Sequence, residues 1–257
     1  MFRIFNSLAK FKKRTALVSE NNSISYQDLI KKSDKIKKTI KGKTVCLMIA
    51  QNNQNFIISY VAFLRKKKVI TILIDETFGQ EFIQNLLKIY KPNYVLSPSK
   101  YFNLFSKENS IFNLGDYSIF ETSSKIHNKL NFKNYLLLST SGTTQSPKFV
   151  RLSSLNLENN VKKIQKYLNI KSNQTTITTM PIGYSYGLSI LNTHLSAGAK
   201  IFINNRSIFE KEFWNNIKKQ KINSFGGVPE FYYYLKKIDF KKKVSKSIKY
   251  LTQAGGK

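Results

Sequence analysis

Short, uninterrupted apolar runs alternate along this chain with segments whose apolar residues recur every three or four positions. The run TVCLMIA covers Thr44–Ala50, and a second run, VITILI, covers Val69–Ile74. Continuous apolar runs of this length are typical of strands buried on both faces of a parallel sheet. Helical spacing is found between the runs, over residues 26–40, 55–65 and 80–90. The alternation predicts an α/β fold of layered, largely parallel sheets flanked by helices.

The same alternation continues to the end of the chain. Further strands are expected near residues 94–97, 135–138, 149–152, 175–179, 200–203, 221–225 and 248–252. Further helices are expected over residues 154–167 and near Leu188, Phe209 and Pro229. Residues 99–134 show the weakest periodicity, and we expect them to be irregular. The pattern suggests a first α/β lobe over about residues 1–133 and a second over about 134–257.

The N-terminal segment MFRIFNSLAKFKKR is basic and amphipathic, but it lacks the apolar core of a signal peptide. We expect a surface helix there, with a membrane-surface or transit segment as the alternative. No run of about 18 apolar residues occurs, so no membrane span is predicted. Cys46 is the only cysteine and cannot form an internal disulfide, which favours a reducing, cytoplasmic location.

The formal net charge of +29 is of the size seen in nucleic-acid-binding proteins. Of the 43 basic residues, however, only five are arginine. Base-edge recognition favours arginine forks, and here lysine is spread over nearly every predicted helix. We therefore expect no specific nucleic-acid partner, only weak, salt-sensitive binding to polyanions.

One polar stretch, STSGTTQSPK over residues 139–148, separates the apolar runs LLL and FV. Its hydroxyl and backbone N–H groups are suited to surround an anion, and Gly142 lets the backbone approach a ligand closely. Lys148 adds a positive charge at the end of the stretch. It is not a Walker loop, in which Gly-Lys-[Ser/Thr] opens a helix. From composition alone, a nucleotide-phosphate loop and a Ser/Thr-rich surface hairpin are both open interpretations.

The full string resembles the phosphate-loop signature of the adenylate-forming (AMP-binding) enzymes, which include acyl-CoA synthetases, peptide-synthetase adenylation domains and firefly-type luciferases. The usual family form is Thr-Ser-Gly-(Thr/Ser)-Thr-Gly-x-Pro-Lys. It is matched here by Thr140, Ser141, Gly142, Thr143, Thr144, Pro147 and Lys148. Gln145 stands where the family has glycine, and Phe149 stands where a second glycine is frequent.

Five further segments are similar to the family in the expected order. They are residues 24–29 (ISYQDL), 45–75, 180–189 (MPIGYSYGLS) with LSAGA downstream, 225–235 (FGGVPEFYYYL) and 251–257 (LTQAGGK). Lys67 departs from the family, which usually has glycine there. The resemblance runs from about residue 16 to the end, and it implies that residues 1–257 form the N-terminal part of the large domain of an AMP-binding (adenylation) enzyme.

The resemblance implies ATP-dependent adenylation of a carboxylic acid, followed by transfer of the acyl group to the thiol of CoA or of a phosphopantetheine carrier protein. Thr140, Ser141, Gly142, Thr143, Thr144 and Lys148 would hold the ATP phosphates with Mg²⁺, and Ala254, Gly255 and Gly256 would lie against adenine. Tyr184 would wall the carboxylate site, and Gly187, Gly227, Val228 and Pro229 would shape the acyl pocket. Core packing is the alternative role for Tyr184 and Tyr186, and His194 is expected to be structural.

Several family features are not found in these 257 residues: the Tyr-Gly-x-Thr-Glu motif, the ribose-binding Asp and the small C-terminal domain with its adenylation lysine. Two interpretations stay open. One is an acid–thiol ligase, or the N-terminal piece of one completed by a second chain; the other is a non-catalytic fragment of a broken gene with residual nucleotide binding. We assign no catalytic residue and no metal ligand, and expect no adenylation at an enzymatic rate by this chain alone. Strands near Lys200 and Ile248 are expected to be unpaired sheet edges.

Overall fold

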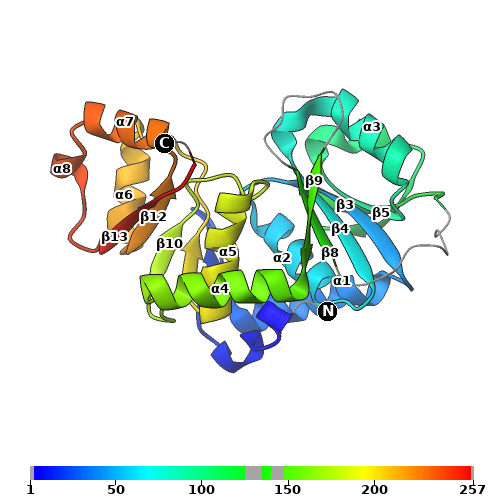
Figure 1. Ribbon diagram of the computed structural model, residues 1–257, viewed down its shortest axis with the longest axis horizontal. Helices are drawn as coiled ribbons and strands as arrows, with labels where there is room; N and C mark the ends of the chain where they lie inside the picture. The colour runs from blue at the N-terminus through cyan, green and yellow to red at the C-terminus, as the bar shows by residue number, and fades with distance from the viewer. Residues whose placement is uncertain (1–2, 125–134, 140–147, 256–257) are drawn as a thin grey trace.

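Two β-sheets organise the molecule in the computed structural model, which describes residues 3–124, 135–139 and 148–255 (Figure 1). Across the seven-stranded sheet, the order is β6 (Asn109–Asn113), β7 (Tyr117–Glu121), β5 (Tyr94–Pro98), β3 (Thr44–Ala50), β4 (Val69–Asp75), β8 (Tyr135–Ser139) and β9 (Phe149–Ser153). Across the six-stranded sheet, it is β13 (Tyr250–Gln253), β12 (Ser224–Gly227), β10 (Thr175–Ile177), β11 (Lys200–Phe202), β1 (Thr15–Val18) and β2 (Ser23–Ser25). The antiparallel pairs are β5–β7, β6–β7, β8–β9 and β1–β2, and the other neighbours are parallel, so the predicted fold class is confirmed.

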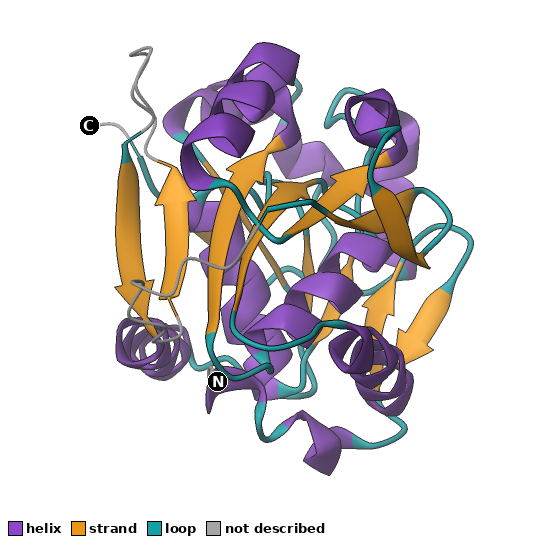
Figure 2. Ribbon diagram, turned by 90° about the vertical axis from the view of Figure 1, so that its right-hand side faces the viewer, coloured by secondary structure: helices purple, strands orange, loops and turns teal. Residues whose placement is uncertain are grey.

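Helices fill the space between the sheets and cover their outer faces (Figures 1 and 2). They are α1 (Tyr26–Thr39), α2 (Gln54–Leu64), α3 (Gly79–Tyr90), α4 (Ser154–Leu168), α5 (Ser185–Ala197), α6 (Lys211–Lys219), α7 (Pro229–Lys237) and the short α8 (Phe240–Lys243). The central core takes its side chains from α1, α2, α4 and α5 and from the inner faces of both sheets. Separate outer cores join the seven-stranded sheet to α3 and the six-stranded sheet to α6 and α7.

The strand β3 shows why its run of seven apolar and small residues forms the middle of a sheet. Successive side chains of a strand point to opposite faces, and accordingly Met48 packs in the central core while its neighbour Leu47 packs in the outer core. All seven residues of β3 are buried. Its bounds are those that the sequence predicts.

Polar caps fix where the helices begin. The Ser25 hydroxyl accepts a hydrogen bond from the Asp28 N–H at 3.0 Å at the start of α1. Ser153 and Asn156 form a reciprocal capping box at the start of α4. Each cap satisfies a backbone N–H that has no partner within its helix. Both helix starts agree with the sequence prediction.

Each sheet takes strands from both halves of the chain. β8 is parallel to β4 of the seven-stranded sheet, and β9 pairs with β8 at the edge of that sheet. β1 and β2 instead belong to the six-stranded sheet, where Leu17 pairs with Ile201. The strands of each sheet are therefore not consecutive in sequence. The pair β8–β9 completes the seven-stranded sheet, and the pair β1–β2 completes the six-stranded sheet.

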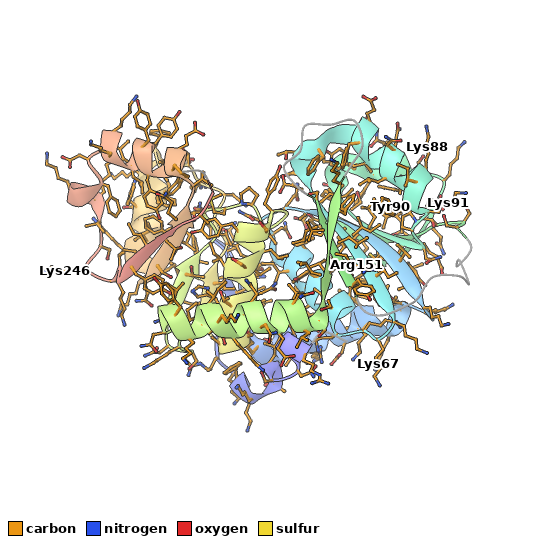
Figure 3. All side chains as sticks on the ribbon, in the orientation of Figure 1. Lys67, Lys88, Tyr90, Lys91, Arg151 and Lys246 are labelled. Atoms are coloured by element: carbon orange, nitrogen blue, oxygen red, sulfur yellow. The ribbon has the colours of Figure 1, made fainter. Side chains whose placement is uncertain are left out.

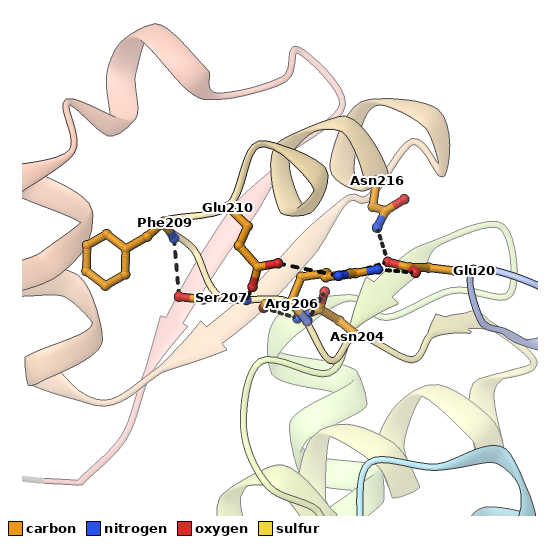
Figure 4. A network of polar contacts seen from close by, with 7 residues as sticks. All are labelled: Glu20, Asn204, Arg206, Ser207, Phe209, Glu210 and Asn216. Carbon is orange, nitrogen blue, oxygen red and sulfur yellow. Dashed lines mark hydrogen bonds and ion pairs between the residues drawn. The ribbon is translucent and has the colours of Figure 1, made fainter.

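A polar network holds the β1–β2 turn against the segment that follows β11 (Figure 4). The Arg206 guanidinium donates to both carboxylate oxygens of Glu20, at 2.7 and 2.8 Å. Asn216 on α6 donates to the same carboxylate at 3.3 Å. The hydrogen bond from Arg206 holds the pKa of Glu20 below its usual value. The network holds strand β1 in register with β11 at the surface of the protein.

Three other sequence predictions are corrected. Residues 99–134 contain the antiparallel strands β6 and β7, which pair at the edge of the seven-stranded sheet. The N-terminal segment forms two short 3₁₀ helices, Arg3–Phe5 and Leu8–Phe11, and its apolar side chains join the central core instead of lying on the surface. β11 is paired on both sides, whereas β13 is an edge strand among the described residues, as predicted. Within that part of the chain, no helix combines the length and apolarity that a membrane crossing requires.

Candidate functional site

The strands that flank the predicted phosphate loop are neighbours in the seven-stranded sheet. β8 and β9 are antiparallel, and Ser139 lies opposite Phe149. The loop itself is outside the described residues, which applies to Thr140, Ser141, Gly142, Thr143 and Thr144. Lys148 is described, is exposed and comes directly before β9. The predicted phosphate loop therefore joins β8 to β9. It leaves β8 at the end of the sheet where the parallel strands β3 and β4 also finish.

The loop that carries Tyr184 is fastened to the ends of strands β3 and β4. Asn52, just after β3, donates to the Met180 carbonyl oxygen at 3.3 Å and accepts from the Ile182 N–H at 3.0 Å. Gly183 lies so close to Asp75 that a Cβ would come within 2.6 Å of it. This contact requires glycine, because any side chain would displace the end of β4.

Asp75 is a buried carboxyl group at the end of β4. Only 3% of the residue is exposed, and burial raises the pKa of its carboxyl group. The Thr77 N–H and hydroxyl both donate to Asp75 Oδ1, at 3.2 and 2.8 Å. The Thr77 hydroxyl also lies 3.3 Å from the Tyr184 hydroxyl. This short chain of contacts sets the position of Tyr184 at the first turn of α5.

Helix α5 begins directly after Tyr184. Tyr184 is its N-cap but makes no side-chain capping bond, so its first turn has backbone N–H groups that can face an anion. Gly187 packs against the loop, where a Cβ would come within 2.1 Å of the Pro181 carbonyl oxygen. Tyr186 points toward the six-stranded sheet, and its hydroxyl donates to the Thr252 carbonyl oxygen at 2.7 Å.

Two segments that the sequence assigns to different ligands come together at the end of the six-stranded sheet. The Ala254 N–H donates to the Gly227 carbonyl oxygen at 3.3 Å. Gly255 has φ of +78°, and a Cβ on it would lie 3.7 Å from Val228 Cγ1. Pro229 is the first residue of α7. The predicted acyl-pocket and adenine-binding segments are thus adjacent, and Gly256 lies outside the described residues.

Two adjoining cavities lie between α4, α5 and these strand ends. The first, of about 310 Å³, is bounded by α5, by the side chains of β12 and β13 and by the end of α4. The second, of about 410 Å³, reaches Leu138 on β8. Ile164, Tyr186, Ser189 and Ala254 line both. Together the cavities run from the end of β8 in one sheet, along one face of α5, to β12 and β13 in the other sheet.

Sequence reasoning missed most of the residues that line the first cavity. Tyr184, Gly187, Val228 and Pro229 are not among its lining residues. One face of α5 lines it instead, at Tyr186, Ser189, Ile190, Thr193 and His194. The spacing i, i+3, i+4, i+7, i+8 marks one face of a helix. That spacing was the signal available in the sequence.

The described residues do not bring together three His, Cys, Asp or Glu side chains in a metal-binding group. The residues present therefore do not fit a resident metal ion, and no Mg²⁺ ligand is assigned to this part of the chain.

Comparison with known proteins agrees with the arrangement of the two sheets and their helices. Oxalate–CoA ligase of Arabidopsis thaliana is 34% identical over 96 residues, which are 37% of this chain and only 19% of that protein's length. The O-succinylbenzoate CoA synthetase of Bacillus subtilis, in complex with AMP, has a TM-score of 0.76 at 16% identity, with 100% of this chain and 68% of that chain covered. ATP-bound MatB from Rhodopseudomonas palustris has a TM-score of 0.77 at 16% identity, with 98% and 55% covered. At such identities the structures show a shared fold.

The family itself is shown by sequence. A family model described as "AMP-binding enzyme" matches residues 4–257, nearly the whole chain. The match includes the phosphate-loop string, the Tyr184 loop and the segment ending in Ala254 and Gly255. The chain therefore belongs to the AMP-binding enzyme family.

Proposed function

We propose that this chain forms the nucleotide- and acid-binding part of an ATP-dependent ligase that converts a carboxylic acid to an acyl-adenylate. The observation that carries the proposal is the pair of adjoining cavities, which connects the phosphate-loop edge at Leu138 with an apolar interior beside α5. A ligand that combines a nucleotide with an acyl group needs such a two-part site.

The chemistry is an in-line displacement at phosphorus. A carboxylate oxygen of the acid attacks the α-phosphorus of ATP, an acyl–phosphate bond forms, and the bond to the bridging oxygen breaks to release pyrophosphate. Catalysis of this kind depends mainly on positioning and on neutralising phosphate charge. ATP would enter as its Mg²⁺ complex, with the metal bound as part of the substrate.

The chain's own residues would contribute in three ways. Lys148 and the loop Thr140–Thr144 would hold the phosphates by charge and by hydroxyl and N–H donors. The uncapped first turn of α5 would face the acid carboxylate, since a helix N-terminus favours an anion. Ala254 and Gly255 would lie against adenine, where the absence of a large side chain leaves room for a ring.

The acceptor of the acyl group would be a thiol, either of CoA or of a phosphopantetheine carrier protein. Three names support a CoA thiol: the oxalate–CoA ligase, the O-succinylbenzoate CoA synthetase and a putative long-chain-fatty-acid CoA ligase are all named for CoA. Their substrates differ, so they leave the acid of this chain undetermined.

The proposal is tested by titrating ATP into the chain and into Lys148→Ala by calorimetry. Loss of a charge-assisted phosphate contact should weaken binding by about 1–3 kcal/mol. Lys246→Ala removes the same charge from an exposed lysine on the far side of the molecule from Arg151 of β9 (Figure 3), and should leave ATP binding unchanged. Equal affinities for all three proteins would contradict a phosphate role for Lys148, and absence of ATP binding to the unmodified chain would contradict the proposal.

A further inference from the structure

The side chains that line the first cavity indicate a narrower class of acid than membership of the AMP-binding enzyme family does. Along α5 the lining residues run from Tyr186, at the first turn, to His194, eight positions later. At about 1.5 Å rise per residue, this face is roughly 12 Å long. Tyr186 is shared with the second cavity, which leads to the phosphate loop, while His194 lines only the first. An acid with its carboxylate at the start of α5 would therefore extend its other end toward His194.

The cavity is lined without a single Asp, Glu, Lys or Arg. All of its lining residues belong to the described part of the chain, and most of the lining is aliphatic or aromatic. An ionised group that is moved into such surroundings without a partner is strongly destabilised. A second carboxylate at the far end of the acid would meet that penalty here. The cavity thus favours a monocarboxylic acid with an apolar body.

His194 gives the far end of the cavity a hydrogen-bond acceptor. It is 3% exposed, and its Nδ1 lies 2.8 Å from the Ile190 carbonyl oxygen. A carbonyl oxygen only accepts, so Nδ1 carries the shared proton and Nε2 is left with a lone pair. Nε2 is buried and has no hydrogen-bond partner in the protein. Burial also lowers the pKa of His194 to about 4, so the ring stays neutral near pH 7.

Two hydroxyl groups stand on the opposite wall. Ser224 and Tyr250 face the cavity from β12 and β13, where they are paired in register. Both hydroxyls are buried and have no partner beyond each other. Buried polar atoms without partners are uncommon, because each forfeits its hydrogen bond to water. His194 Nε2 has no partner at all, and it therefore indicates a ligand that supplies a hydrogen-bond donor there.

We propose that the acid bound by this chain is an apolar monocarboxylic acid that carries a hydroxyl group at the end remote from its carboxylate, and that this hydroxyl donates to His194 Nε2. The inference rests on the proposed function for the direction in which the acid lies. Ser224 and Tyr250 would accept from or donate to the same hydroxyl oxygen. A carboxylate could not replace the hydroxyl, since it offers no proton to Nε2 and would face the lone pair with negative charge.

Three acids of equal chain length test the proposal: ω-hydroxydecanoate, decanoate and decanedioate, each titrated by calorimetry into the whole chain without nucleotide. We expect ω-hydroxydecanoate to bind about tenfold more tightly than decanoate, the scale of one net hydrogen bond. Decanedioate should bind at least about tenfold more weakly than decanoate. Equal affinity of ω-hydroxydecanoate and decanoate, or stronger binding of decanedioate, would overturn the proposal.

Two variants assign the effect to the cavity. In His194→Phe the ratio between ω-hydroxydecanoate and decanoate affinities should fall to about one, because the acceptor is lost. Ile190→Trp should fill the cavity and abolish binding of all three acids while ATP binding persists. If His194→Phe does not fold, the order of the three acids on the unmodified chain still decides.

The outcomes also separate this inference from the proposed function. ATP binding without binding of any of the acids would overturn the inference and leave the nucleotide site standing. The expected order of acids without ATP binding would support the cavity's specificity and contradict the proposed function.

Discussion

The central strands of the seven-stranded sheet are longer than those of the six-stranded sheet. β3 is seven residues long and buried throughout, and β4 has the same length with one residue partly exposed. By contrast, β10 and β11 contain three residues each, and no residue of the edge strand β13 is fully buried. Both sheets have apolar cores on both faces, but beside β12 and β13 the first cavity takes up part of one face of the six-stranded sheet.

The two sheets also differ in the polarity of the side chains that their strands carry. In the six-stranded sheet, Thr176, Ser224 and Thr252 line the cavity, so hydroxyl groups occupy positions that apolar residues fill in β3. Binding sites are commonly drawn from the less stable parts of a fold. We infer that the seven-stranded sheet supplies stability and the six-stranded sheet supplies specificity, and the following predictions test that division.

The largest effect is expected from shortening a core side chain in the well-packed sheet. Leu47→Ala in β3, at a position with no exposed surface, should lower the free energy of unfolding by about 3–5 kcal/mol. Leu251→Ala in β13, which is only partly buried, should lower it by about 1–2 kcal/mol because less apolar area leaves water in the folded state. Urea denaturation of both variants measures the difference. Equal losses in the free energy of unfolding would contradict the proposed division between the two sheets.

The second effect is a pH dependence that belongs to the cavity. The folded pKa of His194, about 4, lies below the ordinary value of 6.5. Between these values the unfolded chain binds a proton that the folded chain does not, so stability falls as the pH is lowered through this range. The full difference is about 3 kcal/mol at 1.36 kcal/mol per pKa unit. Burial raises the pKa of Tyr186 and Tyr250, which line the same cavity, so both stay neutral there.

Denaturation midpoints from pH 7 down to pH 4.5 test this dependence. The stability of His194→Phe relative to the unmodified protein should rise as the pH falls, because the variant has lost the group whose protonation favours unfolding. A stability difference that is constant with pH would mean that His194 titrates alike in both states.

The third effect compares the same chemical change in both sheets. Tyr186→Phe removes the hydrogen bond to the Thr252 carbonyl oxygen beside the cavity. Tyr101→Phe removes one to the Glu76 carbonyl oxygen beside the seven-stranded sheet. Each should cost about 1 kcal/mol of stability, but only Tyr186→Phe should also weaken binding of the acids. An equal loss of acid affinity in both variants would show that the effect is not local.

The smallest effect is expected at the surface network around Arg206. Glu20→Gln leaves an oxygen that accepts from Arg206 but removes the charge. Both partners are well exposed, so the loss in melting temperature should be smaller than for either tyrosine variant. It should vanish in about 1 M salt, where the screening length is about 3 Å. A loss that persists in high salt would point to the hydrogen-bond geometry instead of the charge.

The sequence could predict those elements that consist of consecutive apolar residues or of a regular apolar spacing. β3 has the predicted bounds because all of its residues are buried, and α4 begins at its predicted first residue, Ser154. β12 covers Ser224–Gly227 and extends two residues beyond the predicted end, which was missed because Gly226 and Gly227 carry no apolar signal. Glycine is needed at both positions, since the Tyr186 hydroxyl and the Phe231 ring occupy the space that a Cβ would need. β1 and β2 were missed because they are short and their partner strand lies far along the chain.

Much the same holds for the candidate site. The phosphate loop stays a prediction from the string over residues 139–148, because residues 140–147 lie outside the described part of the chain. The cavity could not be predicted, because it is formed by α5, β12 and β13, and no local pattern says which face of a helix meets which strand. His194 was expected to be structural because it has no partner nearby in sequence. Its burial is confirmed, but only the fold shows that its Nε2 is unpaired.

The pairing of β1 with β11 has a consequence for how the protein is made. The residue Leu17 leaves the ribosome early, yet the Ile201 backbone that it pairs with is synthesised much later. At about 5–20 residues per second, the N-terminal strand waits on the order of ten seconds or more for its partner. During that time its apolar face is available to chaperones and to other nascent chains. The six-stranded sheet is therefore completed late in synthesis, and the yield of folded protein should depend on how well this early strand is protected.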